Sequence, residues 1–394
     1  MIGQATVLLA DMCIASRPKM LHVTCETREH SQKPAGRGLR ELIGAGKFAD
    51  FMQACWPEKP ALFDFPSATL MRLFALARFR TAYSALRQVD GPVMVYGDIP
   101  VDLTDGISNK FYTTPDRADA FLSRGATVEI DHYEVASNEL QRWLAAFKQD
   151  LGLPASVMGK CVVYASSASQ GLDMHFDAYA NFVVQLSGSK TWRLAPNERV
   201  VAPLEHHDMD EPFPSEELQS YWARGAALPA AADIETVTLE AGQMLFVPRG
   251  YWHGTSAGRH SLSLNFTFGQ PAALDLALSA LRRRLAASSH WRALLSCDLI
   301  VEESSTPADR QLREAAIWLQ RLRTEIEKLS PSDLLDASRS LADPYSEANA
   351  LVRQLSRYRD TDGDAARPRR LAAGGENWDD YDKCFAEGME WLAP

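Results

Sequence analysis

Apolar and polar positions follow two different periods along this chain. Between residues 160 and 268, short apolar runs alternate with polar positions and are separated by turn residues, which is typical of antiparallel strands. SGSK is a plausible hairpin loop, and PRGYWHG looks like a tight turn leading off a strand. This central block therefore predicts an antiparallel barrel or sandwich. The candidate strands are KCVVYASS, NFVVQLSG, KTWRLA, IETVTLEA, QMLFVP and HSLSLNFTF.

The segments before this block are mainly helical in pattern. Residues 39–56 and 67–90 look helical, with the short extended piece PEKPALFDFP between them. Residues 91–135 mix short strands with turns. Residues 138–151 predict a helix, because their leucines and Phe147 repeat at helical spacing, and Ser137 can cap it.

The helical period returns after residue 272. One leucine stripe runs from Leu274 to Leu285, and a second runs from Leu312 to Leu329 behind the helix start Thr306-Pro307. RDTDGDAARPRRLAAGGEN reads as a flexible linker, and WDDYDKCFAEGMEWL as a closing helix.

Composition and charge exclude several classes of protein. The 394 residues are 46% hydrophobic and carry a net charge of -10, which argues against direct nucleic-acid binding and mildly favours a basic partner. The sequence contains no apolar run of about 18 residues, so no membrane span is expected. The six cysteines are scattered without a CxxC pair, which favours reduced thiols and a cytoplasmic protein.

The candidate chemistry lies in GLDMHFD, where His175 and Asp177 are two residues apart at the start of a strand-like run. Positions i and i+2 of a strand share a face, so both side chains would point the same way. A later strand can deliver His253, from MLFVPRGYWHGTS, to the same place. Two histidines and one carboxylate form the facial triad of non-haem Fe(II) oxygenases. The alternative is that all three are ordinary polar residues at strand ends.

Lys190 strengthens the oxygenase interpretation. It follows Asp177 by 13 residues, after QLSGS, and a hairpin would bring its strand back alongside the one that carries His175. A cation pointing inward there suits the distal carboxylate of a dicarboxylate cosubstrate. Taken alone, a lysine after a turn is more often a solvated surface charge.

Residues 160–268 resemble the JmjC/cupin-like Fe(II)/2-oxoglutarate oxygenases, most closely the ribosomal-oxygenase type of protein hydroxylase. The resemblance is carried by VYASSASQGLDMHFDAYANFVVQLSGSKTWRL and LEAGQMLFVPRGYWHGTSAGRHSLSLNFTFG, with RGATVEIDHYE and FADFMQACWPEKPALF before them. It implies an α+β fold, in which a double-stranded β-helix (jelly-roll or cupin) barrel lies between N-terminal helices and a C-terminal helical region. It also implies Fe(II) and 2-oxoglutarate as cofactors.

The resemblance also assigns roles to individual residues. His175, Asp177 and His253 fall where the family places its iron ligands. Lys190 falls at the position of the basic residue for the far carboxylate of 2-oxoglutarate, and the resemblance adds Ser166 as a hydroxyl for the same carboxylate. Polar positions near the metal-bound end of the cosubstrate are matched by Asn181 and Asn265. The alternatives are that Ser166 is an ordinary hydroxyl on a strand, and that Asn181 and Asn265 only form hydrogen bonds with the barrel backbone.

The expected activity is hydroxylation of a polypeptide side chain with dioxygen, on a ribosomal protein or a precursor peptide. There are three alternatives. The chain could tailor a peptide natural product or remove N-methyl groups, or it could be a non-catalytic cupin-like binding module. The resemblance further implies a homodimer. The expected organisation is an arm (1–40), a catalytic domain (41–270), a helical dimerisation region (271–330) and a C-terminal helical tail with a flexible linker (331–394).

Overall fold

The computed structural model describes most of the chain between residues 38 and 339. The described ranges are 21–23, 38–97, 110–154, 157–167, 171–208, 214–222, 229–258, 260–293 and 308–339.

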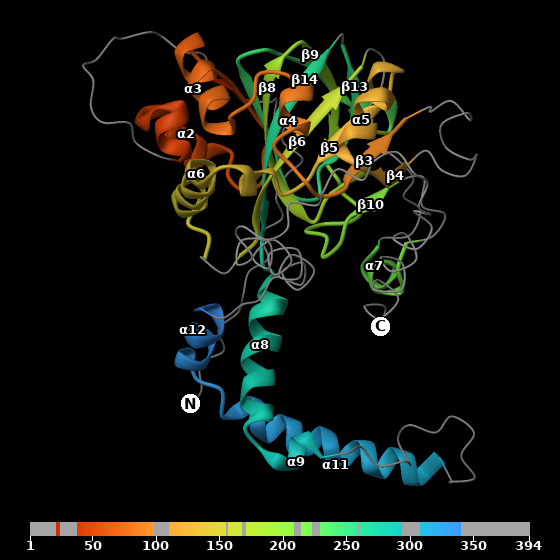
Figure 1. The fold of residues 1–394 in the computed structure, drawn as a ribbon. Helices are drawn as coiled ribbons and strands as arrows, with labels where there is room; N and C mark the ends of the chain where they lie inside the picture. The colour runs from red at the N-terminus through yellow and green to blue at the C-terminus, as the bar shows by residue number, and fades with distance from the viewer. Residues whose placement is uncertain are drawn as a thin grey trace, which may run out of the picture. The chain divides into compact units, whose positions relative to one another are not determined.

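Two antiparallel sheets face each other and form a jelly-roll barrel (Figure 1). The exception to antiparallel pairing is β1 with β2, which run parallel. The large sheet contains, in spatial order, β1 (Leu21–Val23), β2 (Ala61–Asp64), β12 (Gln243–Val247), β8 (Tyr179–Ser187), β14 (Ser261–Gly269), β6 (Gly159–Ser166), β5 (Thr127–Ile130), β3 (Val93–Tyr96) and β4 (Lys110–Thr113). The small sheet contains β10 (His207–Asp208), β7 (His175–Phe176), β13 (Trp252–Ala257), β9 (Ser189–Ala195) and β11 (Glu235–Glu240).

The large sheet is apolar on its outer face. Strand β14 reads SLSLNFTFG, and its Leu264, Phe266 and Phe268 are completely buried in the main core. That core also contains Phe51 and Phe147 from the helices that cover the sheet. The alternate residues of β14 are polar and face the small sheet, so the barrel interior carries polar groups where most sandwiches are apolar.

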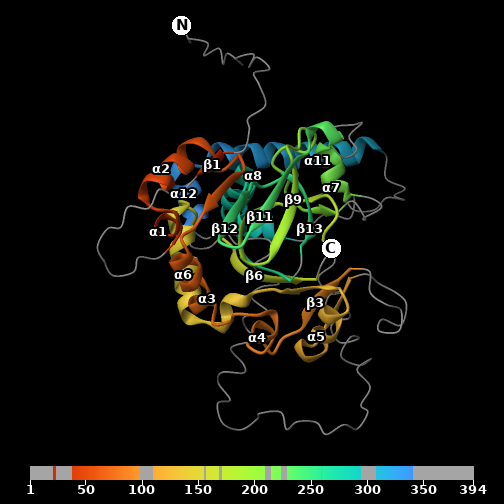
Figure 2. The ribbon, with the colours of Figure 1, turned by 90° about the horizontal axis from the view of Figure 1, so that it is seen from above.

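The helices that cover this outer face come from the N-terminal half of the chain (Figure 2). Ser137 caps α6 by accepting a hydrogen bond from the Leu140 amide, as the sequence predicts. Gly44, at φ +84°, divides the first predicted helix in two. The elements are α1 (Leu39–Ile43), α2 (Ala45–Ala54), α3 (Ser67–Ala77), α4 (Ala82–Leu86), α5 (Pro115–Ser123), the 3₁₀ turn η2 (Tyr133–Ala136) and α6 (Asn138–Asp150).

The C-terminal elements are helical as predicted. Helix α8 packs against α11 and α12, and Arg284 pairs with Glu325 at 2.9 Å. Thr306-Pro307 and the expected closing helix lie outside the described residues. None of the described helices is both long and apolar enough to cross a bilayer. These C-terminal helices are α8 (Ala273–Ala286), α9 (Ser289–Arg292), α11 (Ala308–Glu327) and α12 (Pro331–Arg339). Two short elements, α7 (Glu216–Tyr221) and the 3₁₀ turn η3 (Ala231–Asp233), lie earlier in the chain, between β10 and β11.

Three local predictions are wrong. Strands β8 and β9 do not form a hairpin, because the chain between them crosses from the large sheet to the small one. His175 and Asp177 do not share a strand, since β7 ends at Phe176 and Asp177 lies in the connection to β8. The segment beginning at Trp252 is a strand, β13, and not only a turn.

Candidate active site

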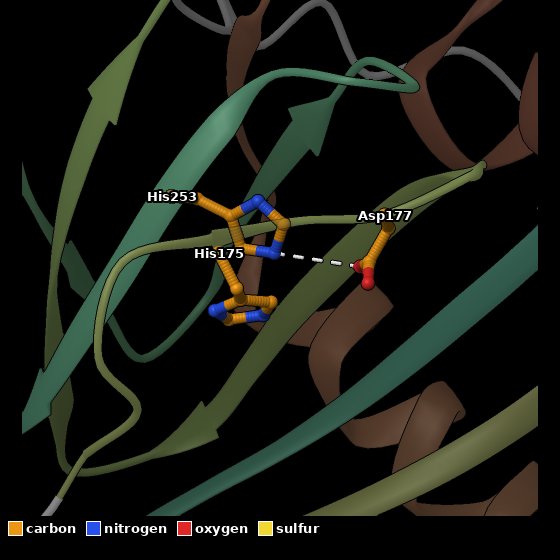
Figure 3. Close-up of side chains that lie close together, drawn as sticks. All are labelled: His175, Asp177 and His253. Carbon is orange, nitrogen blue, oxygen red and sulfur yellow. Dashed lines mark ion pairs between the residues drawn. The ribbon is translucent and has the colours of Figure 1, made fainter. Parts of the chain in front are cut away.

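Side chains from two segments that are distant in sequence meet at one end of the barrel. His175 on β7 lies directly opposite His253 on β13, and Asp177 follows β7 by one residue. One ligand atom from each of the three residues lies within 4.8 Å of the others (Figure 3). The ring centroids of the two histidines are 4.1 Å apart. Two imidazoles and one carboxylate at this separation can hold a single transition-metal ion.

Backbone carbonyl groups orient both imidazole rings. His175 Nδ1 lies 2.8 Å from the carbonyl oxygen of Asp173, and His253 Nδ1 lies 2.9 Å from that of Tyr251. A carbonyl oxygen can only accept, so each Nδ1 carries the proton and donates. In the neutral ring Nε2 then bears the lone pair, which is the arrangement that a metal-ligating histidine needs.

Asp177 is buried and held by an ordered hydrogen-bond chain. Thr267 donates to the Asn181 side-chain oxygen at 2.8 Å, which leaves the Asn181 amide nitrogen to donate to Asp177 Oδ2 at 2.7 Å. His253 Nε2 lies 3.4 Å from the same oxygen (Figure 3). The backbone amide of Gly250 fixes the Asp177 carbonyl at 2.8 Å.

These contacts set the charges of Asp177 and His175. Burial alone would raise the pKa of the Asp177 carboxyl, but His253, His175 and Asn181 together hold it well below its usual range. Burial and the nearby His253 lower the pKa of His175. At neutral pH the site therefore offers an ionised carboxylate, which is a hard anionic donor for a divalent cation.

Glycine allows the loop before His175 to dock on β13. The Leu172 amide donates to Thr255 Oγ1 at 3.0 Å, and the Thr255 amide donates to the Leu172 carbonyl at 2.8 Å. A Cβ on Gly171 would lie 1.8 Å from the Thr255 carbonyl oxygen, so only glycine fits. This contact keeps the strands that carry the two histidines together.

Lys190 points into the barrel from β9 and is 5% exposed. Its Nζ lies 5.3 Å from the ring centre of Tyr164 on the opposite sheet. Burial, partly offset by the charge of Glu129, lowers its pKa to about 8. No salt bridge joins Lys190 to a carboxylate within the described ranges. A buried ammonium without an ion-pair partner suits an anionic ligand.

Several polar atoms in the barrel interior are fully buried and lack a hydrogen-bond partner. Ser263 Oγ and Asn265 Oδ1 lie on β14, Gln185 Oε1 on β8 and Trp192 Nε1 on β9. All four side chains are on faces turned toward the other sheet, as the strand registers require. Unsatisfied buried polar groups are costly, so these four atoms on the inner faces of the sheets are candidates for contacts with a polar ligand.

The structure places the other predicted residues in different roles. Asn181 supports Asp177 as described above. Asn265 is 7% exposed and faces the interior, with its side-chain oxygen unpartnered. Ser166 accepts a hydrogen bond from Thr127 Oγ1 at 3.0 Å and is 2% exposed.

The sequence alone does not single out Ser263 or Gln185, whose buried polar atoms face the interior, or Glu129, whose charge acts on Lys190. The sequence SLSLNFTF could have indicated Ser263, because every second residue of this buried strand is polar. A buried strand with one polar face predicts a polar interior, and Ser263 lies on that face beside Tyr164.

Comparison with known proteins agrees with this geometry. The model of the family described as "JmjC domain" matches residues 147–276. The chain is 35% identical over 318 residues to the uncharacterised protein YxbC of Bacillus subtilis, covering 80% of this chain and 96% of YxbC. It is 27% identical over 271 residues to ribosomal oxygenase 1 of Danio rerio, covering 63% of this chain and 46% of that protein. The chain thus spans about half the length of this second relative.

Among solved structures, similarity extends to Escherichia coli ycfD. The identity is 15% and the TM-score 0.43, with 73% of this chain and 69% of ycfD covered. A ycfD structure described as a complex with cobalt and 2-oxoglutarate matches with 16% identity and a TM-score of 0.42, over 73% of this chain and 68% of that one.

Proposed function

Because the chain belongs to the JmjC-domain family, we propose that it is an Fe(II)- and 2-oxoglutarate-dependent hydroxylase acting on a polypeptide side chain. The observation that carries this proposal is the convergence of His175, Asp177 and His253, whose ligand atoms lie within 4.8 Å of one another. Three protein ligands on one face of a metal leave positions for a cosubstrate and dioxygen.

The donor set fits Fe(II). Both imidazoles are held with Nε2 available, and the carboxylate of Asp177 is kept ionised. The bound iron would supply the oxidising chemistry, in which dioxygen and 2-oxoglutarate are consumed and succinate and carbon dioxide are released. The chain itself supplies position and exclusion of water, and no protein acid or base is required.

The interior also fits 2-oxoglutarate. Lys190 would pair with the far carboxylate, and its ammonium is buried beside Tyr164. The Ser263 hydroxyl lies next to Tyr164 in the sheet register and has no partner of its own. Ser166 and Asn265 remain candidates for further contacts with the cosubstrate.

The substrate proposal is a side chain of a ribosomal protein or of a precursor peptide. The names of several relatives support it, since they are ribosomal oxygenases or a "bifunctional lysine-specific demethylase and histidyl-hydroxylase". The net charge of -10 suits a basic polypeptide. We further propose that residues 41–270 form the catalytic domain and that residues 271–330 mediate a homodimer. The cytoplasmic location predicted from the cysteines stays a prediction.

Anaerobic titration with Fe(II) and 2-oxoglutarate tests the proposal. The wild-type protein should develop a weak visible charge-transfer band near about 500 nm, and His253→Ala should lose it. The exposed His206 provides a matched control, because His206→Ala removes an imidazole elsewhere and should keep the band.

Admitting air should then convert 2-oxoglutarate to succinate in the wild type and in His206→Ala only. A wild-type protein that binds neither iron nor 2-oxoglutarate would support the non-catalytic binding module instead. Mass spectrometry of candidate polypeptides would identify the target by a gain of one oxygen, about 16 Da.

A further inference from the structure

The turn between β12 and β13, residues 248–251, contacts two of the three proposed iron ligands. The Gly250 amide donates to the Asp177 carbonyl at 2.8 Å, and the Tyr251 carbonyl accepts from His253 Nδ1 at 2.9 Å. The turn is closed by the Tyr251 amide, which donates to the Pro248 carbonyl at 3.2 Å. A shift of this turn would therefore move Asp177 and His253 together.

Arg249, the second residue of the turn, ties it to two other segments of the chain. Its Nε donates to the Pro203 carbonyl at 2.7 Å, and its Nη2 to the Ala202 carbonyl at 3.4 Å. Its Nη1 donates to the carbonyl of Gln270, between β14 and α8, at 2.5 Å. A planar guanidinium has several donors in fixed directions, so one side chain can hold three carbonyl groups at once.

The loop that Arg249 holds presses directly on the turn. Pro203 packs so closely on Gly250 that a Cβ on this glycine would lie 2.6 Å from the proline Cδ. Ala202 has a φ of +51°, in the left-handed region that residues with a Cβ rarely adopt. Such a conformation persists where the surrounding contacts hold it, and the two hydrogen bonds from Arg249 are contacts of this kind.

The rest of this loop is anchored independently of Arg249. The Asn197 side-chain oxygen accepts from the amides of Arg199 and Val200, at 3.3 and 3.0 Å. Val200 is buried in the apolar cluster outside the small sheet. The Leu204 amide donates to the Tyr221 hydroxyl on α7 at 3.1 Å. The guanidinium therefore connects the turn to a fixed support.

We propose that Arg249 is a positioning residue for the metal centre, which holds the turn so that Asp177 and His253 stay at the separation that one ion needs. This inference rests on the proposed hydroxylase function and adds a residue that is not itself a ligand. Groups that orient metal ligands through hydrogen bonds are typically worth about 10- to 100-fold in metal affinity. The loss of Arg249 should therefore be seen in how the protein binds a metal ion.

Co(II) binding to the metal-free protein tests this role. Arg249→Lys keeps the positive charge but replaces the guanidinium fork by one ammonium group. We expect the Co(II) dissociation constant to rise about 10- to 100-fold, and the visible d–d spectrum of the bound ion to change because its donor atoms shift. Arg199→Lys is the matched control, because its side chain is exposed on the same loop. This control should match the wild type in both measurements.

Two measurements without metal separate positioning from folding. Hydrogen exchange at the Gly250 amide should be faster in Arg249→Lys than in Arg199→Lys, because the turn is held less firmly. Urea unfolding of the metal-free variants shows whether the fold has also been weakened. If Arg249→Lys does not fold, Arg249→Gln, which keeps an amide donor, is measured in the same way.

An Arg249 variant that binds Co(II) with the affinity and spectrum of the wild type would overturn the proposal. A lower urea midpoint with unchanged Co(II) binding would do so too, since Arg249 would then support only the fold. Both results leave the hydroxylase proposal intact. A wild-type protein that binds no Co(II) would instead overturn the two proposals together.

Discussion

Lys190 holds a positive charge inside the barrel at the expense of stability. Its pKa of about 8 lies below the ordinary value of 10.5, so the folded state disfavours the proton that the unfolded chain keeps. The loss of folding free energy that the charged Lys190 causes is complete below pH 8, and it disappears as the pH rises from 8 toward 10.5. A buried charge that weakens the fold and lies at the proposed position of the 2-oxoglutarate carboxylate is typical of a binding residue.

Lys190→Met should therefore stabilise the ligand-free protein. At pH 7 we expect the free energy of unfolding to rise by on the order of 2–3 kcal/mol, and the gain should shrink between pH 8 and 10.5. Urea unfolding across this pH range measures it. The same variant should lose the thermal stabilisation that 2-oxoglutarate with Mn(II) gives the wild type. A variant that is destabilised at pH 7, or that still responds to 2-oxoglutarate, would contradict the assignment.

At the residue scale, the sequence predicts which three side chains converge, but not the contacts that support them. His175, Asp177 and His253 were identified because two histidines and a carboxylate are a recognisable donor set. The contacts that orient them were not predicted, since the Asp173 and Tyr251 carbonyls are backbone groups that any residue could provide. Alternation alone also does not determine which face of a strand points inward, and so the inward position of Ser263 is not predicted.

At the scale of elements, the predicted strands were correct in place but not in pairing. The SGSK turn looks like a hairpin locally, yet β8 pairs with β12 and β14 while β9 pairs with β11 and β13. A jelly roll places successive strands in opposite sheets, and local sequence carries no signal for that crossing. Helix α5 was missed because it is short and only Ala118 and Phe121 of its residues are buried.

The contact between α2 and the outer face of the large sheet should be a main source of stability. The Phe51 ring on α2 lies 5.4 Å from Phe63, 5.9 Å from Phe182 and 5.1 Å from Phe246, on three different strands. Phe51→Ala should lower the free energy of unfolding by about 3–5 kcal/mol, measured by urea denaturation. The exposed neighbour Gln53 is the control, and Gln53→Ala should change it by less than about 0.5 kcal/mol. Similar losses for both variants would argue against this packing.

At the scale of the whole molecule, three apolar clusters surround or adjoin the polar part of the barrel interior. The main core lies outside the large sheet, and a second cluster around Phe176 and Trp252 lies outside the small one. A third cluster around Val183 and Leu194 fills part of the space between the sheets. Stability thus comes mainly from outside the barrel, which leaves interior positions available for binding residues such as Lys190.

Helix α11 exposes an apolar stripe that fits a second copy of the chain. Leu312, Leu319 and Ile326 recur every seven residues and are 69%, 48% and 47% exposed. A seven-residue apolar repeat is the pattern of a helix that packs along another helix, and leaving it in water is unfavourable. This stripe predicts a homodimer joined through the helical region that follows the barrel.

Leu319→Glu should break this dimer, because two buried carboxylates would face each other or an apolar neighbour across the interface. Sedimentation velocity at micromolar concentration should give a dimer for the wild type and a monomer for the variant. Gln320→Glu introduces the same charge one residue along, at another exposed position of the helix, and should remain dimeric. A wild-type monomer would contradict the predicted dimer, and a Leu319→Glu dimer would place the association on another surface. The Fe(II) and 2-oxoglutarate band should persist in the monomer, since every residue of the site comes from one chain.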